Sequence, residues 1–261
     1  MSASPERLAA WLDSYRQDLK SALEHAARDG FRVVSANTID TELDPRAFSG
    51  TARRHLSRHL RDLGVSFHAL GAEFGGAGLA DARHGEERLD RLLQTVQLCR
   101  DLGVATATVD VTGLANERSK GLAQEALRRC AEISDSAGVR LCVNGGQESP
   151  ALLADELRRF AEAGVGATLD SAVFDPHAGD GARLAGMIGG VLLRDVRRTA
   201  THVEEVQFGA GQVDFPCVLA ALEEAGYAGA LTIRRDAPAG VDALRRGREY
   251  VTPLVGGAMF R

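Results

Sequence analysis

The feature that most constrains the fold is a phrase that recurs along the chain: a helical stretch, then glycine, then a short apolar run. It occurs at residues 26–36, 60–70, 99–109, 134–144, 161–170 and 222–233. Glycine readily adopts the left-handed conformation that ends a helix, so each apolar run after it is predicted to be the next strand. Repetition at roughly 25–40 residues predicts αβ units stacked around one parallel sheet.

The clearest single unit is Gly209–Arg235. Asp214 is a good helix N-cap, and Pro216 stands in the first turn, where a helix tolerates proline. Gly226 ends the predicted helix, and residues 230–233 then form a short apolar run typical of a buried strand.

Two further strands are predicted from weaker patterns, at residues 7–12 and 190–194. The Ala-Ala-Trp centre of residues 7–12 is a poor strand former, so this segment either forms a first strand before a helix at Tyr15–Arg28 or begins that helix. With both strands counted, the 261 residues match a (β/α)8 TIM barrel, which typically needs about 250. Because no Pro/Ser/Gly-rich linker divides the chain, we expect a single domain over residues 1–261.

Composition excludes several classes of protein. A net charge of −5 disfavours nucleic acid as the partner. No apolar run approaches the roughly 20 residues that span a bilayer, and the first residues lack the apolar core of a signal peptide. The cysteines form no CxxC pair, which favours buried, reduced thiols in a cytoplasmic protein over disulfides or zinc. They are Cys99, Cys130, Cys142 and Cys217.

Polar side chains follow most of the apolar runs. In a parallel barrel the carboxyl ends of the strands form the active face, so these residues are predicted to line a ligand-binding mouth. The alternative is that strand ends are polar simply because they meet water. The residues are Asn37, His68, Asp110, Asn144, Asp170, Arg194 with Asp195, and Arg234 with Arg235.

The chain resembles the sugar-phosphate isomerase/epimerase family, the xylose-isomerase-like TIM barrels that include the endonuclease IV type. Gly209–Ile233 is similar to the family's ending of Gly-x-Gly, Val-Asp-Phe and Gly-Tyr-x-Gly, and Leu192–Asp195 is similar to its His-Leu-Lys-Asp strand end. The resemblance covers nearly the whole chain. It implies isomerisation or epimerisation of a sugar through an enediolate.

The resemblance also implies a divalent metal held by two glutamates, an aspartate and a histidine. At those positions stand Asn144, Arg234, Asp170 and Leu192 respectively. Hard cations require several oxygen ligands, and a guanidinium repels them, so we predict that the family's metal is absent. Asp236 is the residue that could restore a ligand.

For catalysis the sequence offers Asp170 as a general base, or as the ion-pair partner of Arg234. His68 is a second acid–base candidate, or a hydrogen-bonded core histidine. Alternation along a strand allows at most one of Arg234 and Arg235 to line the mouth. The residues predicted to bind substrate are Asn144, Asp110, Arg194 and Arg234.

Two glycine-rich segments carry open alternatives. Gly71–Gly85 is either a mobile lid over the mouth or a long surface connection. Gly209–Gly211 either cradles a phosphate through backbone N–H groups or makes a tight turn.

The sequence is compatible with two functions. In the first, the chain is an isomerase/epimerase-like protein that acts on a small sugar, polyol or sugar acid without metal. Alternatively, it is a non-catalytic descendant that binds a small carbohydrate or anion, or serves as a partner subunit. The oligomeric state stays open, with a homodimer as one option.

Overall fold

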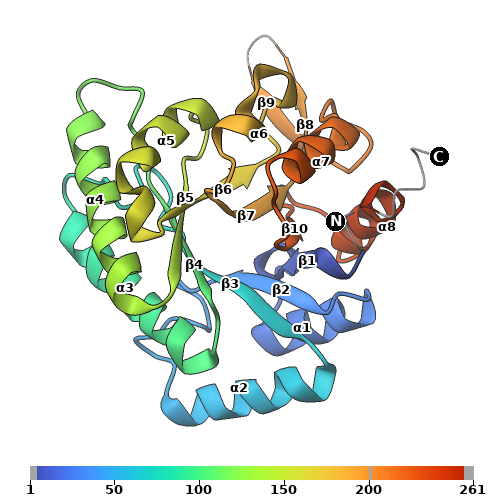
Figure 1. Cartoon of the computed structure of the whole chain (residues 1–261). Coiled ribbons are helices and arrows are strands. Elements are labelled where there is room, and N and C mark those ends of the chain that lie inside the picture. Colours follow the sequence, from blue (N-terminus) through green and yellow to red (C-terminus); the bar gives the residue numbers. More distant parts are fainter. Residues whose placement is uncertain (1–4, 200–201, 256–261) are drawn as a thin grey trace.

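The computed structural model describes residues 5–199 and 202–255. Eight parallel strands close a barrel in the order β1-β10-β7-β6-β5-β4-β3-β2, and helices surround it (Figure 1). The predicted (β/α)8 fold is therefore confirmed. The strands are β1 (Leu8–Trp11), β2 (Val33–Asn37), β3 (Ser66–Ala72), β4 (Thr106–Asp110), β5 (Arg140–Asn144), β6 (Gly166–Asp170), β7 (Ile188–Leu193) and β10 (Leu231–Ile233).

The helices pack their apolar sides against the outside of the barrel. Within the described ranges, none combines the length and the apolar character needed to cross a membrane. They are α1 (Leu19–Arg28), α2 (Gly50–Leu63), α3 (Gly85–Leu102), α4 (Lys120–Ala137), α5 (Pro150–Leu157), α6 (Asp180–Arg183), α7 (Phe215–Glu224) and α8 (Ala243–Val255), with short 3-10 turns η1 (Pro5–Arg7), η2 (Leu12–Tyr15), η3 (Arg158–Ala163) and η4 (Pro176–Ala178).

The recurring glycine phrase has the predicted geometry. Gly64 after α2 and Gly103 after α3 both adopt left-handed conformations, with φ of 63° and 70°. Any side chain at these positions would be strained, so glycine ends the helix and turns the chain into the next strand.

The N-terminal segment forms a strand, β1, which pairs with both β2 and β10 and so closes the barrel. The helix predicted at Tyr15–Arg28 begins later, at Leu19. Its cap is Asp18, whose carboxylate accepts a hydrogen bond from the Ser21 N–H at 2.9 Å.

An antiparallel hairpin that the sequence did not predict lies between β7 and α7. It consists of β8 (Asp195–Arg198) and β9 (Val203–Val206). Its charged sequence has neither a helical period nor an apolar run. The buried Asp195 carboxylate accepts hydrogen bonds from the N–H groups of Gly209 at 2.9 Å and Gly211 at 3.0 Å. The Gly209–Gly211 segment is therefore a turn closed on the protein's own carboxylate.

Alternation along each strand decides which side chains face the barrel interior. In β4, Ala107 and Val109 pack in the hydrophobic core, whereas Thr108 lines a cavity inside the barrel. The same alternation turns Asp110, two residues further on, toward the mouth at the carboxyl end.

Candidate active site at the barrel mouth

A buried ion pair joins the ends of β6 and β7. The Arg194 guanidinium donates to both oxygens of Asp170, through Nε to Oδ1 at 3.2 Å and through Nη2 to Oδ2. The Asp170 side chain is only 4% exposed. Arg194 also donates through Nη1 to Oδ2 of Asp236 at 3.0 Å.

A second guanidinium, that of Arg234, continues this chain of charges. It donates through Nη2 to Oε2 of Glu73 at 2.9 Å and through Nε to Oδ1 of Asp236 at 2.7 Å. Its Cζ lies 4.6 Å from the centre of the Trp11 ring, within reach of a cation–π interaction. Asp170, Arg194, Asp236, Arg234 and Glu73 thus form one alternating series, which we call the mouth network.

The predicted ion pair between Asp170 and Arg234 is wrong, because Arg194 is the partner of Asp170. β6 and β7 are neighbours in the barrel, whereas β10 lies one strand further away. Ser171 also anchors this corner, since its Oγ accepts a hydrogen bond from the Arg194 N–H at 2.8 Å.

Both guanidiniums stay charged. Burial disfavours the charged form of Arg194, but the Asp170 carboxylate outweighs it and raises the pKa of Arg194. Burial likewise opposes the charge on Arg234, and Glu73 with Asp236 raises its pKa. Each carboxylate in the network therefore has a permanent cation beside it.

Asp110 has a different environment. Its Oδ2 accepts a long hydrogen bond from the Gly75 N–H, at 3.4 Å. Burial, and then the nearby charge of Glu73, raise the pKa of Asp110 to about 7. A carboxyl group with this pKa can give or take a proton near neutral pH.

His68 does not stand at a strand end, because β3 continues to Ala72. The register between β2 and β3 shifts after Val34, so His68 occupies an irregularity inside the sheet. Burial lowers its pKa. The predicted strand-end position of His68 is therefore wrong, since an apolar run that ends at a histidine can continue beyond it.

His68 instead borders a cavity of about 20 Å³ inside the barrel. Three polar atoms of its lining find no hydrogen-bond partner among the described residues: Nε2 of His68, Oγ of Ser35 and Oγ1 of Thr168. This volume suffices for one water molecule, which such a polar lining would bind.

Asn144 and Leu192 border the same cavity, beneath the mouth network. Asn144 Oδ1 accepts a hydrogen bond from the Gly146 N–H at 3.0 Å, and Leu192 pairs in register with Asp170. The four positions that the family resemblance assigns to metal ligands thus hold one carboxylate, already bonded to a guanidinium, together with an amide, an alkyl group and a second guanidinium. This donor set does not suit a hard divalent cation.

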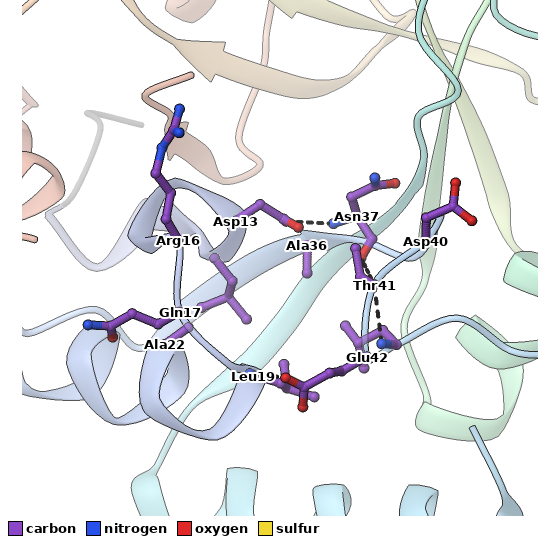
Figure 2. Close-up of a pocket in the computed structure, with 12 residues that line it drawn as sticks. Asp13, Arg16, Gln17, Leu19, Ala22, Ala36, Asn37, Asp40, Thr41 and Glu42 are labelled. Carbon is purple, nitrogen blue, oxygen red and sulfur yellow. Dashed lines mark hydrogen bonds between the residues drawn. The ribbon is translucent and has the colours of Figure 1, made fainter. Parts of the chain in front are cut away.

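A polar cleft of about 540 Å³ adjoins the network at the ends of β1 and β2 (Figure 2). Its volume is within the range of small-molecule sites. Asn37 connects the cleft to the network, because its Oδ1 accepts a hydrogen bond from the Glu73 N–H at 3.1 Å. The polar lining includes Asp13, Arg16, Gln17, Asn37, Asp40 and Glu42.

Sequence reasoning missed Glu73, Trp11 and Asp13. Glu73 follows β3 directly, two residues after Gly71. A Cβ at Gly71 would lie 3.0 Å from Thr108 Oγ1 and 3.2 Å from the Trp11 ring, so this face of β3 is directed into the barrel. The sequence did contain a signal for Glu73. If the strand is extended beyond its apolar residues, Glu73 lies two positions after Gly71 and therefore on the same face of the strand. Asp13 follows β1, and burial raises its pKa while its Oδ2 accepts the Asn37 N–H at 2.8 Å.

Together the fold and the mouth define a (β/α)8-barrel protein with a charged site at the carboxyl ends of its strands. The chain belongs to the xylose isomerase-like TIM barrel family, whose model matches residues 23–253. No curated protein sequence matches it significantly.

Solved structures of low sequence identity share the fold. A xylose isomerase domain protein from Planctomyces limnophilus is 18% identical, with a TM-score of 0.79 and 97% of each chain covered. An IolI protein with a bound zinc atom is 17% identical, with a TM-score of 0.79 and 98% of each chain covered. D-psicose 3-epimerase with D-tagatose, from Clostridium cellulolyticum H10, is 13% identical, with a TM-score of 0.72 over 98% of this chain and 99% of the epimerase.

Proposed function

We propose that the chain binds a small, polyhydroxylated carbohydrate at the barrel mouth and acts on it as a metal-independent isomerase or epimerase. The observation that carries this proposal is the pairing of Arg194 and Arg234 with Asp170, Asp236 and Glu73. Two guanidiniums neutralise the carboxylates that a metal would need. The sugar epimerase among the structural neighbours supports the class of substrate.

Proton transfer falls to Asp110 in this proposal. As a carboxylate it would take a proton from the carbon next to a sugar carbonyl, to give an enediolate, and return it to the former carbonyl carbon, while the hydroxyl proton passes to the former carbonyl oxygen. Epimerisation would require a second proton donor on the opposite face of the sugar. An arginine N–H of the network would stabilise the negative charge that develops on the carbonyl oxygen, the role of the metal in relatives that hold one. The raised pKa of Asp110 suits it to this exchange at neutral pH.

The cleft lined by Asp13, Asn37 and Glu42 would receive the hydroxyl groups. Carboxylates suit this role because they accept hydrogen bonds from vicinal hydroxyls, and the Asn37 amide can both accept and donate them. The network holds three carboxylates and two guanidiniums. The adjoining cleft adds Asp13, Asp40 and Glu42 against Arg16, and this excess of negative charge favours a neutral sugar or polyol over an anion.

The test measures deuterium exchange into candidate ketoses and aldoses in D₂O, together with calorimetric binding of the same sugars and of their acids and phosphates. We expect binding, and exchange that survives treatment with EDTA and is lost in Asp110→Asn. Arg83→Gln, which changes an exposed guanidinium in the loop before α3, is the control. Exchange that requires added Mn²⁺ or Mg²⁺, or that persists in Asp110→Asn, would overturn the proposed mechanism.

One observation favours the second candidate, a non-catalytic descendant. Both oxygens of Asp170 are bonded to Arg194, and Oδ1 also accepts the Ala172 N–H at 2.8 Å. This carboxylate is therefore not free to act as a base. Sugar or anion binding without exchange in any tested compound would identify the chain as a binding protein.

A further inference from the structure

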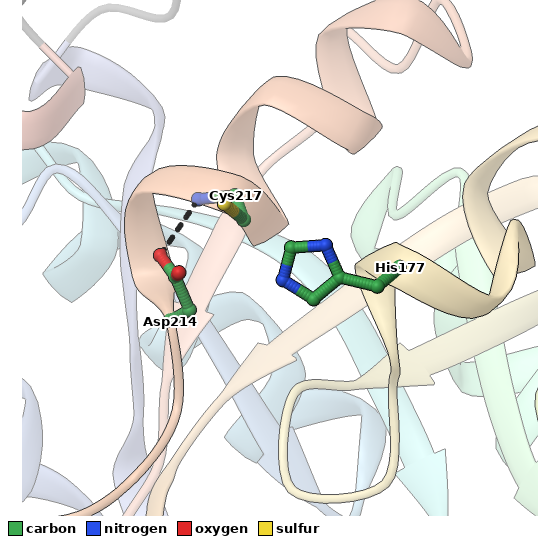
Figure 3. Close-up of side chains that lie close together, drawn as sticks. All are labelled: His177, Asp214 and Cys217. Carbon is green, nitrogen blue, oxygen red and sulfur yellow. Dashed lines mark hydrogen bonds between the residues drawn. The ribbon is translucent and has the colours of Figure 1, made fainter.

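A group of three metal-ligand side chains lies outside the mouth network. Within the described part of the chain, ligand atoms of His177, Asp214 and Cys217 all lie within 4.8 Å of one another. His177 comes from η4, after β6, and the other two from the start of α7. Figure 3 shows the imidazole directed toward the Asp214 carboxylate and the Cys217 thiol. His177 and Asp214 are exposed and Cys217 is half-buried, so an ion can reach the group from solvent.

The backbone on both sides of this group is held in place. The Asp175 carboxylate caps η4 by accepting the His177 N–H at 2.9 Å. Asp214 Oδ1 caps α7 by accepting the Cys217 N–H at 3.0 Å, which leaves Oδ2 for another partner. At Gly181 a Cβ would lie 2.9 Å from the Ala221 carbonyl oxygen, so α6 packs directly on α7. The two segments therefore keep a defined separation.

We propose that His177, Asp214 and Cys217 form a zinc-binding site that links the segment after β6 to the start of α7. Imidazole nitrogen, carboxylate oxygen and thiolate sulfur are the ligands of tetrahedral Zn²⁺, and three protein ligands leave a fourth position for water. Zinc bonds of about 2.0–2.3 Å bring ligand atoms closer together than 4.8 Å, so side-chain rotation closes the site. Mg²⁺ and Ca²⁺ are excluded because they require mostly oxygen ligands.

Charge balance explains how a cation can bind at a helix N-terminus, which by itself repels cations. Binding of the metal releases the proton of the Cys217 thiol to solvent. The thiolate and the Asp214 carboxylate then neutralise both charges of Zn²⁺, with neutral His177 as the third ligand.

The spacing of the cysteines alone favoured packing over zinc, because it contains no CxxC pair. Cys99, Cys130 and Cys142 do pack as expected, since all three are buried. Cys217 differs because the fold brings it to a histidine and an aspartate, and that histidine is distant in sequence.

Cobalt(II) is the probe, because a cobalt–thiolate bond gives an ultraviolet charge-transfer band and tetrahedral cobalt gives intense visible bands. The full chain is reduced, treated with chelator, desalted and titrated with Co²⁺, and Zn²⁺ is then added. We expect the bands at one equivalent, their displacement by Zn²⁺, and their loss in Cys217→Ser and His177→Ala. Asp214→Asn, which keeps the helix cap, should weaken them.

Two controls keep this result separate from the mouth. His84→Ala removes an exposed histidine whose Nδ1 lies 3.1 Å from Asp81, a pair without a thiol, and should leave the bands unchanged. Asp170→Asn should also leave them unchanged, whatever it does to sugar binding. Absence of the thiolate band, or its persistence in Cys217→Ser, would overturn the zinc site without bearing on the sugar proposal.

A second readout is alkylation of Cys217, followed by mass spectrometry. Zn²⁺ at ten times its dissociation constant should slow this reaction about tenfold, in proportion to the fraction of free sites. An unchanged rate at saturating Zn²⁺ would also contradict the proposal.

Discussion

Individual charged residues decide the character of the mouth, and the most consequential is Arg194. It pairs with a carboxylate that is only 4% exposed, and such a pair is costly to break from one side. The resemblance to the family suggested Arg234 for this role. Arg194 and Arg234 follow adjacent strands of the barrel, β7 and β10, and only the strand order shows which of the two reaches Asp170.

A double-mutant cycle tests this pairing. Arg194→Met should lower the free energy of unfolding by about 3 kcal/mol, because Asp170 remains buried and unpaired, and Asp170→Asn should restore part of the loss. The matched cycle of Arg234→Met with Asp170→Asn should show much weaker coupling. Urea denaturation of the single and double variants gives both coupling energies, and equal values would contradict the assigned partner.

Asp110 provides a pH prediction. Its pKa is about 7 in the folded chain against 3.8 for the free group. The folded state therefore holds the proton more tightly, and this residue's contribution to stability falls as pH rises from about 4 to about 7. Asp110→Asn should stabilise the protein by up to about 4 kcal/mol at pH 8 and have little effect at pH 4.

Asp81→Asn is the control of opposite sign. Backbone N–H groups of Arg83 and His84 lower the pKa of Asp81 to about 2. Its carboxylate therefore contributes stability above pH 4, and this contribution is lost as pH falls toward 2. Thermal unfolding across pH measures both variants, and a pH-independent effect of Asp110→Asn would show that its pKa is not raised.

At the scale of elements, the connection between β3 and α3 is seated against the end of β4. Gly78 forms an isolated antiparallel bridge with Val111, and the Leu79 N–H donates to the Asp110 carbonyl at 2.8 Å. A Cβ at Gly78 would lie 2.0 Å from that same carbonyl oxygen. This glycine permits the close approach that places the loop beside Asp110.

Gly78→Ala should therefore displace the loop and lower the free energy of unfolding by more than about 2 kcal/mol, because steric displacement adds to the penalty for a left-handed alanine. Gly76→Ala is the matched control, because Gly76 has the same φ of 59° but a Cβ there would meet no atom within 4 Å. It should cost only about 1 kcal/mol, the penalty for a left-handed alanine. Calorimetry measures the loss of stability in both variants. Similar losses would show that close contact with the Asp110 carbonyl does not restrict the residue at position 78.

At the scale of the whole molecule, closure of the barrel depends on the first strand meeting the last. Arg7, directly before β1, donates through Nε to the Gly229 carbonyl at 2.8 Å and through Nη2 to the Tyr227 carbonyl at 3.0 Å. These bonds join the two ends of the sheet at its N-terminal rim, next to the pairing of β1 with β10.

Arg7→Ala should lower the free energy of unfolding by about 2 kcal/mol, because two carbonyls lose a charged donor. Arg32→Ala is the control, since Arg32 makes one exposed bond of 3.4 Å to the Leu63 carbonyl. Its effect should be within about 0.5 kcal/mol. Thermal unfolding measures both variants. If Arg7→Ala lowers stability no more than Arg32→Ala does, the contact of Arg7 does not contribute to closure of the barrel.

The sequence by itself determined the barrel, the helix ends and most polar strand ends, because these depend on local rules. Glycine at a left-handed position ends a helix wherever it occurs, and alternation orients Asp110 and Asp170 once their strands are recognised. The weak first strand was the exception. Its Ala-Ala-Trp centre has little strand propensity, and pairing on both edges overrides it.

Only the tertiary structure decided which charges meet. Strand order places Arg194 rather than Arg234 on Asp170, and the irregularity in β3 moves the strand end from His68 to the segment that carries Glu73. Ion pairs require contact within a few ångströms between residues distant in sequence, so their partners follow from the order and register of the closed barrel and not from local pattern.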